Sequence, residues 1–169
     1  MMNDMMTHSI GVNDVLVNGM AVNNVMMNDV TAVPPLRLLV VEDEALVALA
    51  VESILTDCGY DVVGIANNLR SAMGIATAER PDLALVDMQL SGGDSGLAVA
   101  AALRTIGTPT MFVTGNCPTE SGAETDAELA LGCLHKPFTD AALTDAVRAV
   151  AAVLAGNPPT TLPGAFRLF

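Results

Sequence analysis

The chain has 169 residues, enough for one domain with some chain to spare. Hydrophobic residues make up 51% and aromatic residues only 3%, so the core must consist of leucine, valine, isoleucine and alanine. A formal net charge of -12, with only 7 lysines and arginines, leaves no basic surface for DNA, RNA or an anionic membrane, and it argues against those partners.

Residues 1–35 differ from the rest of the chain. They are rich in methionine, asparagine, valine and aspartate and end in Pro34-Pro35, which predicts a mostly disordered leader. No lysine or arginine precedes Arg37, and no apolar run approaches the roughly 20 residues that span a bilayer. We therefore expect a cytoplasmic protein without a membrane segment.

Regular patterns begin at residue 36. The apolar run 36–41 predicts a buried strand, and residues 44–58 carry apolar side chains at helical spacing. Gly59 stands where it would end that helix. Residues 60–66 predict a second strand and 69–80 a second helix.

The second half repeats this alternation. Short apolar runs predict strands at 83–86, 110–113 and 133–135. Helical spacing predicts helices at 95–106 (with Ser95 as N-cap), 119–131 (weak in helix-forming residues) and 139–155. Residues 156–169 are too few for a domain, and we expect a short solvated tail.

Strands that alternate with helices over residues 36–155 predict a single α/β domain. Its sheet should be parallel, covered by helices on both faces and connected by right-handed crossovers. In such sheets, ligands bind beyond the carboxyl ends of the strands. The residues that follow each apolar run are therefore the candidates for function.

Polar side chains follow four of the five predicted strands. They are Glu42, Asp43 and Glu44 after the first strand, Asp87 after the third, Thr114 (followed by Gly115) after the fourth, and Lys136 (followed by Pro137) after the fifth. Each alone has an ordinary structural interpretation, since aspartate commonly caps helices and fills turns. Together they suit phosphoryl chemistry: carboxylates for Mg²⁺, a carboxylate nucleophile, a hydroxyl for a phosphate oxygen and an ammonium to neutralise charge.

The three cysteines, Cys58, Cys117 and Cys133, form no CxxC motif, and His8 and His135 make no metal-ligand pattern with them. An odd, scattered set suits a reducing compartment. We expect buried or half-buried free thiols.

The segments LLVVEDE, ALVDMQLSGGDSG, MFVTGN and CLHKPF resemble the receiver domain of bacterial two-component response regulators. The resemblance covers roughly residues 36–154. It implies a flavodoxin-like (βα)5 fold with a doubly wound, parallel five-stranded sheet in the order 2-1-3-4-5.

The resemblance also implies a role for each strand-end residue. Asp87 would be the phospho-acceptor, and Mg²⁺ would be the cofactor. The metal would be held by Asp43, Asp87 and the backbone carbonyl of Gln89, with Glu42 acting through water. Thr114 and Lys136 would contact the phosphoryl group, and the Lys136–Pro137 peptide would be cis.

Two positions depart from the usual receiver pattern. Cys133 stands where receivers carry the aromatic switch residue, so coupling between Thr114 and an aromatic ring cannot operate in its usual form; a redox role for Cys133 is the alternative to a small buried side chain. Gly115 follows Thr114 where alanine is usual. The stretch FVTG at 112–115 partly resembles the alphaproteobacterial single-domain subfamily named for its Phe-Ala-Thr-Gly motif.

No output domain fits after residue 155. We therefore expect a single-domain, non-enzymatic regulator that accepts a phosphoryl group from a histidine kinase or phosphotransfer protein and signals by contact with a downstream protein, without binding DNA or membrane. The resemblance allows a homodimer through the face of helix 4, strand 5 and helix 5.

Three other classes of protein share part of this pattern. A haloacid-dehalogenase-type phosphatase would need an aspartate at position 89, which is Gln89. A nucleotide-binding flavodoxin-like domain would need a loop that attracts phosphate after the first strand, where Glu42, Asp43 and Glu44 repel it. A receiver-like interaction module that is never phosphorylated is disfavoured by the complete set of acids, threonine and lysine.

Overall fold

A computed structural model of the chain describes residues 34–117 and 128–169. The elements of this part are, in chain order, β1 (Arg37–Val41), α1 (Ala45–Asp57), β2 (Asp61–Ala66), α2 (Leu69–Glu79), β3 (Leu83–Val86), the 3-10 turn η1 (Ser91–Gly93), α3 (Gly96–Thr105), β4 (Thr110–Thr114), β5 (Gly132–His135), α5 (Asp140–Leu154) and β6 (Phe166–Leu168). Every element predicted within the described residues is present, with ends that differ by one residue at most.

The helix ends follow from local chemistry. Ser95 caps α3 by accepting a hydrogen bond from the Ala98 amide at 3.1 Å, as predicted. Gly59 follows α1 with a φ of 85°, a left-handed conformation that favours glycine. Thr139 caps α5 in the same manner as Ser95.

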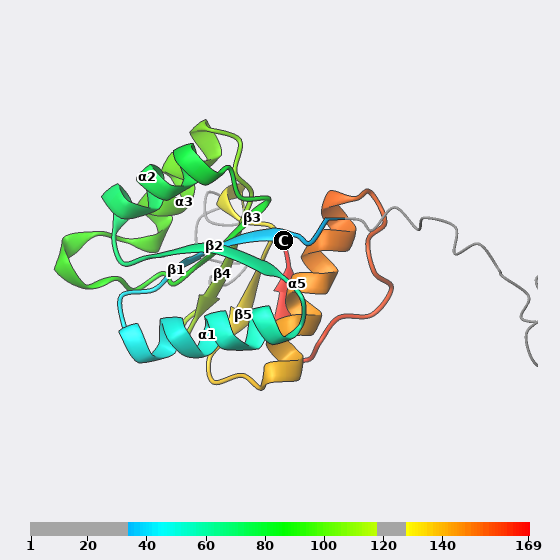
Figure 1. Cartoon of the computed structure of the whole chain (residues 1–169). Helices are drawn as coiled ribbons and strands as arrows, with labels where there is room; N and C mark the ends of the chain where they lie inside the picture. The colour runs from blue at the N-terminus through cyan, green and yellow to red at the C-terminus, as the bar shows by residue number, and fades with distance from the viewer. Residues whose placement is uncertain (1–33, 118–127) are drawn as a thin grey trace, which may run out of the picture. The chain divides into compact units, whose positions relative to one another are not determined.

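The sheet order is β2-β1-β3-β4-β5-β6, and the first five strands are parallel. This confirms the predicted α/β fold and the 2-1-3-4-5 order. Helices cover both faces, with α1 and α5 on one and α2 and α3 on the other (Figure 1). Alternate residues of each central strand enter the two cores, which is why β3 and β4 are buried along their whole length.

A sixth strand was not predicted, and the expectation of a solvated C-terminal tail is wrong. β6 pairs antiparallel with β5. Phe166 is buried in the same core as the apolar side chains of α5. Gly132 of β5 permits this pairing because a Cβ there would lie 2.5 Å from the Arg167 carbonyl oxygen. β6 therefore lies along the edge of β5, at the face considered for a homodimer.

Two predictions lie wholly or largely outside the described residues. The leader at 1–35 is described only from Pro34, and the weak helix at 119–131 is described only from residue 128, with 128 and 129 helical. Among the helices of the described part, none is both long and apolar enough to cross a membrane.

Candidate functional site

Three of the predicted functional residues meet at the carboxyl end of the sheet, because backbone pairing continues one residue beyond the strands. The Asp87 amide donates to the Val41 carbonyl at 2.9 Å, and the Lys136 amide donates to the Thr114 carbonyl at 2.8 Å. The Glu42 amide donates to the carbonyl of Ala66 at 2.9 Å. The side chains of Glu42, Asp87 and Lys136 therefore leave the same sheet edge from fixed backbone positions.

Lys136 joins the two acids. Its Nζ atom lies 2.6 Å from Oε2 of Glu42 and 2.6 Å from Oδ2 of Asp87. The Glu42 side chain is 6% exposed and that of Asp87 11%, so solvent screens these ion pairs only in part. Burial alone would lower the pKa of Lys136, but hydrogen bonds and charge from Asp87 and Glu42 outweigh it, and the pKa is raised. Lys136 therefore remains an ammonium beside the Asp87 carboxylate.

Asp43 is oriented by a residue that sequence reasoning missed. Its Oδ2 atom accepts hydrogen bonds from the Ser91 amide, at 2.9 Å, and from the Ser91 hydroxyl. These two bonds lower the pKa of Asp43, although partial burial opposes them. Ser91 lies within the segment that resembles a receiver, but nothing in its spacing marks it as a partner of Asp43.

The loop after β3 packs closely against Asp87. The Gln89 amide donates to Oδ1 of Asp87 at 3.0 Å, and Gln89 pairs with Ser95 across the loop. Gly96 approaches so closely that a Cβ there would lie 2.1 Å from the Asp87 carbonyl oxygen. The Asp87 carboxylate is thus contacted by the Lys136 ammonium and by the Gln89 backbone amide.

Thr114 lies at the end of β4, as predicted, and is fully buried. Its hydroxyl accepts a hydrogen bond from the Asn116 amide at 3.4 Å. The Lys136–Pro137 peptide that follows β5 is cis, as the resemblance implies.

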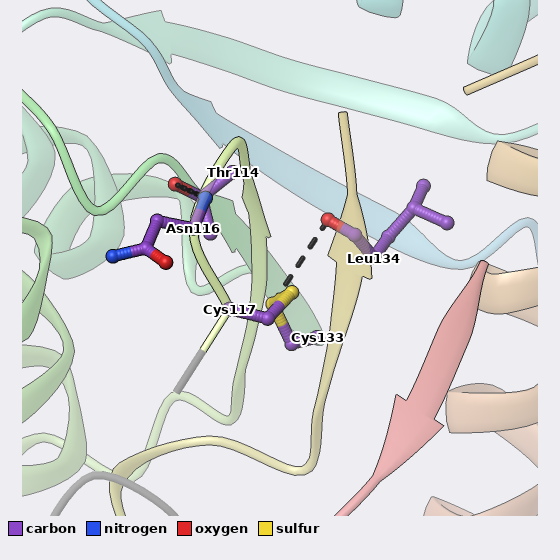
Figure 2. The surroundings of a disulfide bond; sticks show 5 residues. All are labelled: Thr114, Asn116, Cys117, Cys133 and Leu134. Carbon is purple, nitrogen blue, oxygen red and sulfur yellow. Dashed lines mark hydrogen bonds between the residues drawn. A yellow bond between two sulfur atoms is a disulfide. The ribbon is translucent and has the colours of Figure 1, made fainter. Parts of the chain in front are cut away.

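The cysteines differ from expectation. Cys117 and Cys133 form a disulfide with a Cα–Cα distance of 5.9 Å, so the prediction of scattered free thiols is wrong for this pair (Figure 2). Cys58 is free but exposed rather than buried. Cys133 itself is buried in the core, at 1% exposure. Cys117 lies in the loop after β4 and Cys133 within β5. Nothing in the sequence predicts that they form a disulfide, because they come close only when β4 and β5 pair.

The donor atoms suit Mg²⁺ in type, since carboxylates and a backbone carbonyl are the oxygen ligands that it prefers, and it needs only one or two carboxylates besides water. No cluster of three or more acidic, histidine or cysteine side chains placed to hold a metal ion occurs in residues 34–117 and 128–169. Asp43 faces Ser91 instead. A cavity of about 620 Å³ opens beside these two residues.

The parallel sheet in the order 2-1-3-4-5 with helices on both faces defines a receiver-type α/β fold. It superposes on the signal receiver domain of a modulated diguanylate cyclase from Desulfovibrio desulfuricans G20 with a TM-score of 0.61 and 31% identity, covering 72% of this chain and 94% of that one. The receiver domain of the putative response regulator NarL from Mycobacterium tuberculosis gives a TM-score of 0.62 at 28% identity, covering 73% and 99%.

The chain belongs to the response regulator receiver domain family, whose model matches residues 38–148. A similar curated protein is the phyllosphere-induced regulator PhyR of Methylorubrum extorquens, 40% identical over 79 residues. That match covers 46% of this chain and 30% of PhyR, so the chain spans only about a third of this relative. The chain is thus a receiver domain of the two-component system class.

Proposed function

We propose that this receiver accepts a phosphoryl group on Asp87 from the phosphohistidine of a kinase or phosphotransfer protein. The observation that carries the proposal is the position of Lys136, whose ammonium lies 2.6 Å from the Asp87 carboxylate and is held there by the buried Glu42. A cation in this place neutralises charge on a phosphoryl oxygen as the group transfers.

In the transfer, a carboxylate oxygen of Asp87 attacks phosphorus, the P–N bond of the phosphohistidine breaks, and the imidazole leaves. Lys136 exchanges its contact with Asp87 for one with a phosphoryl oxygen, while Glu42 retains it. The Thr114 hydroxyl donates a hydrogen bond to a second phosphoryl oxygen, which its role as acceptor from the Asn116 amide leaves it free to do. The product is an acyl phosphate on Asp87.

Mg²⁺ would be held by Asp43, Asp87 and the Gln89 carbonyl, with Glu42 acting through water, and it would neutralise phosphoryl charge when bound. Ser91 donates two hydrogen bonds to Oδ2 of Asp43, so it competes with the metal for that oxygen.

We further propose that the protein acts in the cytoplasm by contact with another protein and not as an enzyme. The net charge of -12 opposes direct DNA binding. A homodimer through strand 5 would use a face whose edge β6 already occupies, so any such dimer must contact β6 or the flanking helices.

The test is incubation with Mg²⁺ and acetyl phosphate, followed by intact-mass measurement. We expect an adduct of roughly 80 Da, one phosphoryl group, on the wild type and on Asp145→Asn, and none on Asp87→Asn. Asp145 is a suitable control because it is a half-exposed carboxylate on α5 whose ion pair, within the described part of the chain, is with Arg148. No adduct on the wild type would favour the unphosphorylated interaction module, and an adduct on Asp87→Asn would refute Asp87 as the acceptor.

A further inference from the structure

The disulfide joins two segments that flank the proposed phosphoryl site. Cys117 lies three residues after Thr114, in the loop that leaves β4, and Cys133 lies three residues before Lys136, within β5. Phe112 of β4 is the register partner of Cys133. Figure 2 shows the disulfide linking the loop after β4 to strand β5, with Thr114 and Asn116 on the same short segment as Cys117.

The bond restricts the segment that must move. The loop from Gly115 to Cys117 holds the Thr114 hydroxyl through the Asn116 amide, at 3.4 Å. That hydroxyl can accept from Asn116 and still donate its own hydrogen, but in the described part of the chain it has no hydrogen bond to Asp87 or Lys136, so the loop must shift to bring it to a phosphoryl oxygen. A covalent link from Cys117 to the buried Cys133 opposes this shift, because β5 is fixed between β4 and β6.

The two sulfur atoms differ in access. Cys133 is 1% exposed, whereas Cys117 is half-buried at the end of the described loop. An attacking thiolate therefore reaches the Cys117 sulfur first, which makes Cys133 the leaving group. Once reduced, the Cys133 thiol has an acceptor close by, since its sulfur lies 3.9 Å from the Leu134 carbonyl oxygen (Figure 2).

We propose that Cys117 and Cys133 form a reversible thiol–disulfide site for low-molecular-weight thiols, and that its oxidised form slows phosphorylation of Asp87. In reduction, the thiolate of a small thiol attacks Cys117, the S–S bond breaks, and Cys133 leaves as a thiolate that takes a proton. A second small thiol then attacks the mixed disulfide, releasing Cys117 and a small-molecule disulfide. Two electrons and two protons pass to the protein, and a small-molecule disulfide reverses the reaction.

The effect on Asp87 rests on the proposed function, whereas the redox reaction does not. The redox reaction is tested by titrating the folded protein in mixtures of reduced and oxidised glutathione and then counting alkylated thiols by mass. The titration uses Cys58→Ser, because the exposed Cys58 would itself form a mixed disulfide with oxidised glutathione. We expect no alkylated thiol at the oxidising end and two at the reducing end, with full reversal. A count that stays the same throughout the titration would overturn the site.

The effect on phosphorylation is tested by the initial rate of the acetyl phosphate adduct in each form. We expect the reduced protein to react at least threefold faster than the oxidised protein, and Cys117→Ser to react at the reduced rate under both conditions. Cys58→Ser is the matched control, because it removes an exposed thiol outside the pair and must keep the redox response. Because Cys117 is half-buried, its serine variant avoids placing a hydroxyl in the core at position 133.

The outcomes separate the two proposals. Equal rates in both forms would overturn the coupling while leaving Asp87 as the acceptor. No adduct in either form would overturn the proposed function and the coupling together, and the thiol count would still decide the redox site.

Discussion

Replacement of Gly132 by alanine should detach the C-terminal strand. An added Cβ would lie 2.5 Å from the Arg167 carbonyl oxygen and 2.6 Å from Cζ of Phe166. The first contact is with backbone, so no change of side-chain rotamer relieves it. Either β6 loses its pairing with β5, or the two strands stay paired at a spacing that is several tenths of an ångström wider.

The cost can be worked from what β6 contributes. Phe166 is 5% exposed, and burial of such a side chain is worth about 2–3 kcal/mol. If flanking hydrogen bonds such as that from the Phe169 amide to the Leu131 carbonyl (3.1 Å) are retained, the loss of stability stays close to the burial energy of Phe166. We expect Gly132→Ala to lower the free energy of unfolding by about 2–3 kcal/mol and Tm by about 6–9 °C.

Thermal unfolding and amide hydrogen exchange provide the measurements. The amides of residues 166–168 should exchange at least tenfold faster in the variant, while those of β1 and β3 keep their protection. Gly164→Ala is the matched control, because no atom lies within 4 Å of a Cβ at that position in the same tail. A Tm within about 1 °C of wild type, with unchanged exchange in β6, would refute the argument that Gly132 admits this strand.

Three further predictions concern the site. Gly96→Ala should cost about 2–3 kcal/mol of stability and slow the phosphorylation of Asp87, since a Cβ there would lie 2.1 Å from the Asp87 carbonyl oxygen; denaturant unfolding and the adduct rate measure the two effects. Ser91→Ala should tighten Mg²⁺ binding about fivefold in calorimetry, because it removes the competing hydrogen bond from the hydroxyl, worth about 1 kcal/mol, while the amide of residue 91 still donates to Asp43. Lys136→Met should destabilise the protein by about 2–3 kcal/mol in urea at pH 7, because two largely buried carboxylates lose their cation.

Each of these three predictions has a control variant or a result that would contradict it. Gly74→Ala in α2, where a Cβ meets nothing within 4 Å, should be neutral or stabilising, so an equal loss there would remove the steric reason given for Gly96. Mg²⁺ affinity that is unchanged by Ser91→Ala would show that Ser91 does not compete with the metal. Arg148→Met, which breaks an exposed ion pair, should cost under about 0.5 kcal/mol, and a similar loss there would contradict the role given to burial at Lys136.

The pH dependence follows from the pKa shifts of Lys136 and Asp43 at the site and of Tyr60 outside it. The raised pKa of Lys136 means that its contribution is complete below pH 10.5 and is lost as pH rises through the folded-state value. The lowered pKa of Asp43 means that its contribution is present above pH 3.8 and is lost as pH falls through the folded-state value. Urea titrations from pH 2 to 12 should show a smaller alkaline loss in Lys136→Met, with the remainder due to Tyr60, whose pKa is raised by burial. An alkaline loss unchanged from wild type would contradict the contribution given to Lys136.

The sequence by itself determined the sheet, most of its helices and the acids, threonine and lysine at its edge. Apolar runs and helical spacing are local signals, and the parallel topology brings every strand end to one edge. Asp87 and Lys136 could therefore be paired in advance, although 49 residues separate them.

Only the tertiary structure decided the rest. The fit of Phe166 over Gly132, the hold of Ser91 on Asp43 and the bond between Cys117 and Cys133 all join segments that no periodicity relates. Each depends on the distance between two backbones to within a few tenths of an ångström, and that distance is set by packing of the whole domain rather than by local sequence.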